Sequence, residues 1–248
     1  MKEAEYYRNF EYEEKNWWFI GMRSIYQGLL DLFININMEM PKKLLDTGCG
    51  TGGMLRYLKK YGFVIGSDVS MTALEFCRKR GETHLVLSNS LRLPFQNNSL
   101  DVITAFGVIE HLDDDTTMLK ELYRVCKPEG RLFILTSAFQ FLWSYHDDAN
   151  EHKRRYTRGG LSDRVGQSGF RIEKICYVNT FLFPVILLIR LIQKIFYNNR
   201  KLDKVKRDII TPPFGINKLL TYILQLEARL LRRRDLPFGV SLICVAQK

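Results

Sequence analysis

The sequence lacks cysteine pairs that could build a covalent or metal-bound framework. None of its five cysteines forms a C-x-x-C pair, and they are widely separated along 248 residues. Disulfide scaffolds and structural zinc sites need grouped cysteines, so the spacing argues against both and favours a reducing compartment. The N-terminal stretch MKEAEYY also lacks the apolar core of a secretory signal. We therefore expect an intracellular, cytoplasmic protein.

The sequence also lacks a long apolar segment without charged residues. The dense apolar stretch Phe181–Tyr197 contains Arg190, and Lys194 follows one turn later. A spanning helix needs about twenty apolar residues with few or no charges, so we predict no membrane span. Three interpretations remain: a buried cap helix, a contact between two copies, or a helix lying on lipid. A second amphipathic segment begins at Gly215 and ends at Arg232–Arg234, and this composition suits peripheral membrane contact.

Positive charge is concentrated in one part of the chain. The net charge is +10, and residues 190–235 contain twelve basic and four acidic residues. This concentration predicts a docking surface for an anionic partner, and residues 181–234 could contact an anionic membrane surface. A solvated helical surface is the other interpretation. These features predict no particular oligomeric state.

The chain contains enough apolar material for a folded core, since 46% of its residues are hydrophobic and 12% aromatic. Short apolar stretches alternate with amphipathic ones, which predicts a doubly wound α/β sheet with parallel strands. The expected strands are residues 42–46, 63–68, 84–89, 100–106, 131–137, 171–179 and 241–246, and expected helices include 52–60, 70–79, 116–125 and 161–169. We divide the chain into an N-terminal helical segment (1–38), an α/β domain (39–179 and 240–248), and a basic, apolar helical insertion (180–239) forming a cap beside the last strand.

The most informative segment is the glycine-rich stretch Asp46–Gly53 (DTGCGTGG), which follows an apolar strand. It predicts a tight turn that no side chain obstructs, followed by a helix whose N-terminal amides face a ligand. A second predicted strand ends at Asp68, twenty residues after Gly48, where a carboxylate suits the hydroxyls of a ribose. The pattern therefore predicts a βαβ unit that binds a nucleoside.

Two classes of cofactor fit this unit. Gly48, Gly50 and Gly53 match the G-x-G-x-x-G pattern of dinucleotide sites. Gly48, Gly50 and Gly52, with Asp46 two residues ahead, match D-x-G-x-G-x-G instead. An acid at this turn would repel a pyrophosphate but attract a cationic ligand with an amino group. Asp46 therefore favours S-adenosylmethionine.

Further motifs follow in order: Gly66–Ser70, Leu93–Phe95, Asp101–Ile103, Val108–Leu112 and Glu121–Gly130. With the glycine motif, they make residues 17–170 resemble class I S-adenosylmethionine-dependent methyltransferases of the type 11/type 12 group. The resemblance implies a Rossmann-like, seven-stranded, mostly parallel sheet with an antiparallel last strand. It also implies a methyltransferase whose cofactor is S-adenosylmethionine. The N-terminal helices and the helical insertion before the last strand add to this fold.

The resemblance also implies cofactor contacts. Asp46 would face the methionine end, Asp68 the ribose hydroxyls and Val69 the adenine. Asn89 stands where relatives have an aspartate that receives the adenine amino group. The implied cofactor-binding residues are Asp46, Gly48, Cys49, Gly50, Gly52, Asp68, Val69, Asn89, Ser90, Leu91, Phe106 and Gly107. Arg23 could clamp the methionine carboxylate or could be an ordinary surface arginine.

The acceptor side is expected in residues 142–157 (LWSYHDDANEHKRRYT), at the carboxyl edge of the sheet where ligands bind in such folds. His146 and His152 are the candidate catalytic bases, because histidine exchanges protons near neutral pH. Arg154, Arg155 and Tyr156 are candidate substrate-binding residues: relatives have a similar His-x-x-Arg-Tyr stretch, and arginine binds anionic groups.

Other interpretations of this stretch are a loop held by polar contacts and a metal cluster of His146, Asp147 and His152. We expect no metal, because nothing in the pattern fixes a ligand geometry and methyl transfer needs none. His111, in the Glu110-His111 pair, is interpreted as structural.

We therefore expect a methyltransferase acting on a small-molecule or lipid- or polyprenyl-linked acceptor by in-line transfer. Two alternatives stay open: an RNA methyltransferase, favoured by the pI of 9.4, and a non-catalytic cofactor-binding scaffold subunit. The sequence shows no recognised RNA-binding module, and Phe106–Ile109 stands where a base-flipping motif would follow the fourth strand. Nucleic acid is therefore the less favoured partner.

Overall fold

The centre of the molecule is a seven-stranded sheet with strand order β3-β2-β1-β4-β5-β7-β6. The computed structural model describes residues 3–34, 41–197 and 211–248. The strands are β1 (Lys42–Thr47), β2 (Gly62–Asp68), β3 (Leu85–Leu87), β4 (Leu100–Phe106), β5 (Cys126–Ser137), β6 (Arg171–Val178) and β7 (Ser241–Gln247). β7 lies between β5 and β6 and runs antiparallel to both, while the other pairs are parallel. This confirms the predicted doubly wound sheet with an antiparallel last strand.

The strand order reverses direction between β1 and β4. From β1 the chain proceeds to β2 and β3 on one side and then returns to pair β4 on the other side of β1. In open α/β sheets a crevice forms at the carboxyl ends of the strands at such a reversal, and ligands bind there. The carboxyl ends of β1, β2 and β4 are therefore where a ligand site is expected.

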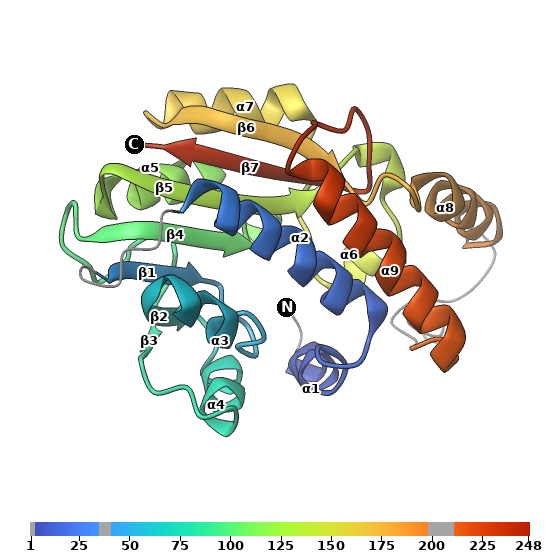
Figure 1. The fold of residues 1–248 in the computed structure, drawn as a ribbon, viewed down its shortest axis with the longest axis horizontal. Helices are drawn as coiled ribbons and strands as arrows, with labels where there is room; N and C mark the ends of the chain where they lie inside the picture. The colour runs from blue at the N-terminus through green and yellow to red at the C-terminus, as the bar shows by residue number, and fades with distance from the viewer. Residues whose placement is uncertain (1–2, 35–40, 198–210) are drawn as a thin grey trace.

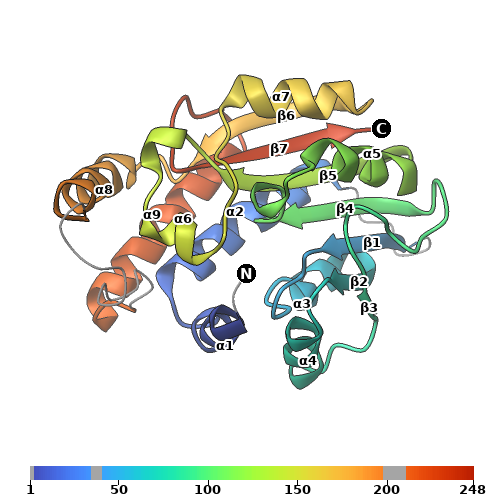
Figure 2. The same cartoon turned by 180° about the vertical axis from the view of Figure 1, so that it is seen from behind.

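Helices cover both faces of the sheet, with α2 and α9 on one face (Figure 1) and α5 and α7 on the other (Figure 2). The helices are α1 (Glu3–Tyr12), α2 (Trp17–Phe33), α3 (Leu55–Leu58), α4 (Met71–Lys79), α5 (Asp115–Val125), α6 (Tyr145–Ala149), α7 (Arg158–Gln167), α8 (Phe183–Tyr197) and α9 (Phe214–Leu231), with 3₁₀ turns at η1 (Lys59–Tyr61), η2 (Ile109–His111) and η3 (Gln140–Leu142). Ser70 caps α4 as predicted, because its hydroxyl accepts a hydrogen bond from Ala73 N.

The helix after the glycine-rich turn is shorter than the 52–60 segment predicted. α3 covers four residues, Leu55–Leu58, and the chain continues as the 3₁₀ turn η1. Gly52 has φ of +81°, which is outside the helical region, so the helix cannot begin there. The glycine-rich turn is therefore longer than predicted and extends to Met54, just before α3.

The second half of the 180–239 insertion differs from the expected cap. α9 packs directly along α2: a Cβ on Gly21 would lie 2.4 Å from Cδ1 of Leu224, so only glycine permits this close approach. Leu224 and Leu231 are fully buried in a core cluster that also contains Ile25 and Ile243. α9 is thus part of the helical layer on the sheet. Residues 198–210 of the insertion lie outside the described residues.

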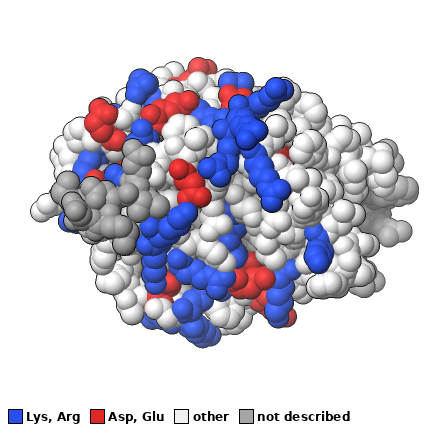
Figure 3. Space-filling model, in the orientation of Figure 1, with Lys and Arg blue, Asp and Glu red and all other residues white. Residues whose placement is uncertain are grey.

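α8 lies at the end of the molecule toward which the parallel strands point (Figure 1). Figure 3 shows that this end is almost free of charged side chains. Within residues 3–34, 41–197 and 211–248, no helix is long and apolar enough to cross a membrane, which agrees with the prediction for 181–197.

Candidate functional site

The turn after β1 leaves its backbone open to a ligand. Gly48 and Gly50 have φ of +66° and +55°, a region that glycine adopts without strain. A Cβ on Gly48 would lie 2.4 Å from Cγ2 of Val108, whereas a Cβ on Gly50 would meet no atom of the described residues within 4 Å. Gly50 therefore faces open space at the carboxyl edge of the sheet, where a bound molecule could approach its main chain closely.

Two buried carboxylates flank the turn. Asp46, in β1, is 3% exposed and accepts a hydrogen bond from Oγ1 of Thr104 (2.6 Å). Asp68, at the end of β2, is 6% exposed and accepts hydrogen bonds from the amides of Gly50 (3.0 Å) and Ser70 (2.9 Å). Neither carboxylate has a lysine or arginine partner among the residues that the structure describes.

The two acids are held in an environment that disfavours their charge. Burial, together with the negative charges of Asp68 and Glu13, raises the pKa of Asp46 to about 7 against the opposing hydrogen bond from Thr104. Burial also raises the pKa of Asp68, although amide hydrogen bonds oppose it. Buried negative charge without a partner is unfavourable until a cation is placed beside it. The site therefore suits a cationic ligand that also presents hydroxyl donors.

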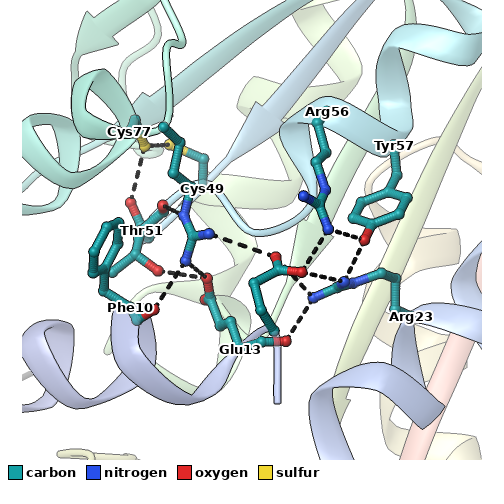
Figure 4. A network of polar contacts seen from close by, with 11 residues as sticks. Phe10, Glu13, Arg23, Cys49, Thr51, Arg56, Tyr57 and Cys77 are labelled. Atoms are coloured by element: carbon teal, nitrogen blue, oxygen red, sulfur yellow. Dashed lines mark hydrogen bonds and ion pairs between the residues drawn. The ribbon is translucent and has the colours of Figure 1, made fainter. Parts of the chain in front are cut away.

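A third acid, Glu13, joins the N-terminal helices to the glycine-rich turn (Figure 4). Its carboxylate accepts hydrogen bonds from Oγ1 of Thr51 (2.7 Å) and Nη2 of Arg80 (2.9 Å), and its side chain is 13% exposed. Arg80 also donates to the carbonyls of Thr51 (2.8 Å) and Phe10 (3.2 Å). The segment after α1 is thus fastened over the turn. Glu13 was not found by sequence reasoning, because no local pattern links it to a turn almost forty residues away.

Arg23 has neither of the two roles considered for it from the sequence. Its side chain is 9% exposed, and Nη1 donates to Oη of Tyr57 (2.5 Å) and pairs with Glu14 (3.3 Å). Nη2 donates to the carbonyl of Glu13 (2.7 Å). Figure 4 shows Arg23 and Tyr57 beside the same network. Arg23 therefore connects α2 to α3 and to the segment after α1, and these bonds occupy its guanidinium.

The predicted adenine side follows β2 and β3. Val69 directly follows Asp68 and is 70% exposed, so an apolar surface is available to a ligand there. Asn89 is exposed, and its Oδ1 accepts a hydrogen bond from Leu91 N (2.9 Å), while Ser90 is buried. An amide oxygen has a second lone pair, so this bond leaves Asn89 able to accept another hydrogen. The roles of Asn89, Ser90 and Leu91 stay predictions.

The end of β4 provides the opposite wall. Gly107 has φ of +72°, and a Cβ there would meet no atom within 4 Å in the described parts of the chain, so its main chain also faces open space. The ring of Phe106 stacks on Tyr26 of α2 at 4.3 Å between centroids. Cys49 is buried, and its sulfur lies 3.9 Å from that of Cys77, so its side chain packs into the core beneath the turn.

On the acceptor side, the side chain of His152 contacts the carboxylate of Asp147. Nδ1 of His152 lies 2.9 Å from Oδ1 of Asp147. Although burial alone would raise the pKa of Asp147, hydrogen bonds from His152, Arg155 and Ser144 N hold that pKa well below its usual range. Asp147 therefore stays ionised and accepts, so Nδ1 of His152 must be the donor and Nε2 has the free lone pair. No hydrogen bond to Nε2 exists within the described part of the chain.

His152 lies beside a cavity of about 410 Å³ whose lining residues are His111, Glu151, His152 and Lys153. The amide of Lys153 donates to the carbonyl of Glu110 (2.7 Å), which holds this segment against the turn after β4. The rings of His111 and His152 are 4.7 Å apart, edge to face, and burial lowers the pKa of His111 to about 3. His111 is therefore neutral and packs against His152, as its structural interpretation requires.

His146 is farther from the pair. Its ring centroid is 6.1 Å from that of His152, and its nitrogens lie 3.3 Å from Nδ2 of Asn150. No cluster of histidine, cysteine or acidic side chains with a metal-binding arrangement occurs among the described residues. Of the two histidines proposed from sequence, the geometry favours His152 as a base.

The three proposed substrate-binding residues have internal partners. Arg155 is 4% exposed and binds both oxygens of Asp147 (2.8 and 2.9 Å) and the carbonyl of Ala138 (3.0 Å). The buried Tyr156 hydroxyl donates to Oδ2 of Asp115 (2.7 Å), and Arg154 pairs with the same oxygen (3.2 Å). The spacing correctly indicated a polar cluster. Arg155 and Tyr156, however, direct their hydrogen bonds to Asp147, Ala138 and Asp115, and so hold the loop together. Their role in binding a substrate stays a prediction.

Comparison of the sequence with known proteins finds a matching family and several similar proteins. Residues 45–134 match the family model described as "Methyltransferase domain". The chain is 29% identical over 125 residues to a demethylmenaquinone methyltransferase from Oceanobacillus iheyensis, covering 46% of this chain and 52% of the relative. It is 30% identical over 142 residues to a ubiquinone/menaquinone biosynthesis C-methyltransferase from Wigglesworthia glossinidia brevipalpis, covering 51% and 56%. The chain thus spans about half the length of the curated relatives it matches.

A solved structure shares the fold over nearly its whole length. A SAM dependent methyltransferase from Archaeoglobus fulgidus superposes with a TM-score of 0.57, at 20% identity, over 91% of this chain and 94% of that one. The similarity therefore includes regions outside the 45–134 match.

Proposed function

From the premise that residues 45–134 match a methyltransferase domain and that the chain has the class I methyltransferase fold, we propose that it transfers a methyl group from S-adenosylmethionine to an apolar small-molecule acceptor. The family expected from the sequence motifs is confirmed by the match. The observation that most supports the proposal is the pair of buried carboxylates, Asp46 and Asp68, on either side of the open main chain at Gly50. Their uncompensated charge fits a ligand with cationic and hydroxyl groups.

The residues present fit this cofactor. Asp46 would hold the amino group of the methionine portion, Asp68 would accept hydrogen bonds from the ribose hydroxyls, and the exposed face of Val69 would contact the adenine. The open main chain at Gly50 and Gly107 would admit the ligand between β1 and β4. When bound, the cofactor supplies a methyl group made electrophilic by its positively charged sulfur.

The protein's own contribution to the transfer is positioning and proton removal. Asp147 fixes the His152 ring by accepting from Nδ1, and Arg155 and Ser144 N hold Asp147 in place. Nε2 of His152 would take the proton that the acceptor releases as its new bond to the methyl carbon forms. Burial raises the pKa of Glu110, whereas a positive charge on His152 lowers it, so an ionised Glu110 and the resulting imidazolium would stabilise each other.

For the acceptor, we propose the reduced form of the quinone class, a ring with acidic hydroxyls and an apolar tail. The names of the two curated relatives support this class. Deprotonation of a ring hydroxyl increases electron density at the neighbouring ring carbon, which takes the methyl group. That carbon then loses its hydrogen as a proton and the ring oxygen regains one, so one proton is released overall, and His152 can accept it. A lipid-linked acceptor of other structure that also releases a proton would use the same arrangement.

The test is incubation of the pure protein with labelled S-adenosylmethionine and demethylmenaquinone, or a short-chain analogue, kept in its reduced dihydroxy form by added dithionite. Mass spectrometry of the extract follows. Appearance of a methylated product with equimolar S-adenosylhomocysteine would support the proposal. Binding of the cofactor without release of either product, across phenolic and lipid acceptors, would instead favour a non-catalytic binding subunit.

A further inference from the structure

Exposed apolar side chains are concentrated in the insertion. Of the nineteen large apolar residues exposed in the described part of the chain, twelve lie between residues 181 and 238. A surface exposing such a continuous apolar area is uncommon in a monomer and marks an interaction site.

On α8 these residues form a single stripe. Val185, Leu188, Ile189 and Ile192 follow helical spacing, and their exposed fractions lie between 45% and 58%. Leu182, just before α8, belongs to the core cluster shared by α2 and α9, and Ile186 within α8 packs against that cluster. α8 is therefore anchored to the protein by one face and presents a continuous apolar face outward.

α9 adds a second stripe that ends in positive charge. Leu219, Tyr222 and Leu226 are exposed on one face, and the exposed Arg229 continues the same spacing one turn later. Three exposed arginines, Arg232–Arg234, follow directly. Figure 3 shows a mostly uncharged area over α8 and along α9, and a group of basic side chains where α9 ends. Lys218, in the first half of α9, is an exposed basic residue within this area.

We propose that this face, formed by the exposed stripes of α8 and α9 and the arginines 229 and 232–234, docks onto an anionic lipid surface. An apolar face bordered by arginines matches the interface of a bilayer, where acyl chains lie beneath negatively charged headgroups. The only acid within α8 or α9, Glu227, is buried and accepts from the amides of Thr180 and Phe181. A second copy would present the same arginines and no exposed acid from these helices to pair with them.

The lipid-facing surface is continuous with the carboxyl edge of the sheet. The ring of Phe139, just after β5, stacks on Tyr177 (4.8 Å) and lies 6.2 Å from Phe183 at the start of α8. Phe183 in turn contacts Phe238 (5.4 Å). An acceptor with an apolar tail could thus pass from the bilayer along aromatic side chains to the site. This last step rests on the proposed function, whereas docking itself does not.

The test is sedimentation of the full chain with vesicles of phosphatidylcholine alone or mixed equally with phosphatidylglycerol, at low and high salt. We expect at least about tenfold tighter binding to the anionic vesicles, weakening as salt increases. The pair L188D and I192D, and separately the triple change R232S, R233S and R234S, should each weaken that binding by about tenfold or more. Leu32→Asp, at an equally exposed leucine on α2, is the matched control and should bind as wild type does.

Three outcomes would overturn the proposal: no vesicle binding by the wild type, unchanged binding of both variants, or equal loss in the Leu32 control. A wild-type dimer that L188D and I192D dissociate, without vesicle binding, would assign the face to a second copy. Titration of each variant with S-adenosylmethionine separates the two proposals. A variant that binds the cofactor normally but no longer binds vesicles shows an effect on the surface alone. Vesicle binding by a protein that does not bind S-adenosylmethionine would count against the proposed function alone.

Discussion

Nδ1 of His152 lies 2.9 Å from Oδ1 of Asp147, and both side chains are almost completely shielded from solvent. The same carboxylate binds the Arg155 guanidinium through both of its oxygens. Asp147 is therefore a fixed anion that sets the tautomer of His152 and directs Nε2 away from itself. This is the arrangement expected of a histidine base, in which a carboxylate orients the ring without accepting its proton.

Replacing His152 with alanine should lower kcat by about 10²- to 10⁴-fold, the usual contribution of a positioned base. The Kd for S-adenosylmethionine should change little, because the cofactor is placed by Asp46, Asp68 and the glycine-rich turn. Steady-state kinetics with a phenolic acceptor and calorimetric titration of the cofactor give the two readouts.

His146→Ala is the matched control, since His146 lies in the preceding helix α6 and its ring contacts Asn150. We expect a much smaller effect on kcat. Equal losses in both variants, or a loss confined to KM, would show that the loop only shapes the pocket and that His152 is not a base.

The substitution Gly50→Ala should separate cofactor binding from folding. The added methyl group meets open space, so the structural penalty is that of a left-handed alanine, about 1–2 kcal/mol. The same methyl group would occupy the volume that the cofactor needs. We therefore expect a folded protein with S-adenosylmethionine affinity reduced by at least about a hundredfold, an effect comparable to about 3 kcal/mol.

Gly48→Ala gives the contrasting case, because its methyl group would clash with Val108 as well as strain the backbone. It should lower the melting temperature much more than Gly50→Ala does. If Gly50→Ala bound the cofactor with unchanged affinity, the ligand could not lie against this turn.

Cofactor affinity should depend on pH through Asp46. Its folded pKa, about 7, lies above the ordinary value of 3.8, so the free protein holds this group largely protonated below pH 7. A cationic ligand favours the carboxylate, so binding releases a proton. Affinity should therefore fall by up to about tenfold for each pH unit below 7 and level off above it. Calorimetric titration of S-adenosylmethionine between pH 5.5 and 8.5, roughly one and a half pH units on either side of 7, would measure this dependence of affinity on pH.

Asp46→Asn should bind more weakly at pH 8 and lose most of this dependence. If the affinity of Asp46→Asn still changed with pH as in the wild type, another group would be responsible for the pH dependence.

The sequence predicted the parts of this site that depend on local pattern. The glycine-rich turn, Asp46 and Asp68 follow from short-range steric and strand-end rules, and the structure places all three at one edge. The partners of His152 and Arg155 could not be predicted, because a run of polar residues does not specify which of them pair. Glu13 and the packing of α9 on α2 likewise depend on contacts between distant segments, which leave no periodic signal.

Glu13 offers a test of the electrostatic coupling across the site. Its negative charge helps to raise the pKa of Asp46, so Glu13→Gln should let Asp46 ionise at lower pH. The midpoint of the pH dependence of cofactor binding should then shift below 7. The variant should also lose about 1–3 kcal/mol of unfolding free energy in urea, because Arg80 loses its shorter carboxylate contact and keeps only the pair with Glu14 (3.5 Å).

Glu11→Gln is the control. Glu11 is exposed near the end of α1, two residues before Glu13, and its replacement should change neither the midpoint nor the unfolding free energy. In Glu13→Gln, the amide oxygen of the new side chain can still accept from Thr51, so the segment after α1 should remain over the turn. The shift in the pH midpoint would then result from the lost charge of Glu13 and not from movement of the segment after α1. A midpoint that stays near 7 in Glu13→Gln, with stability reduced as expected, would mean that Glu13 fastens the N-terminal segment without contributing to the potential at Asp46.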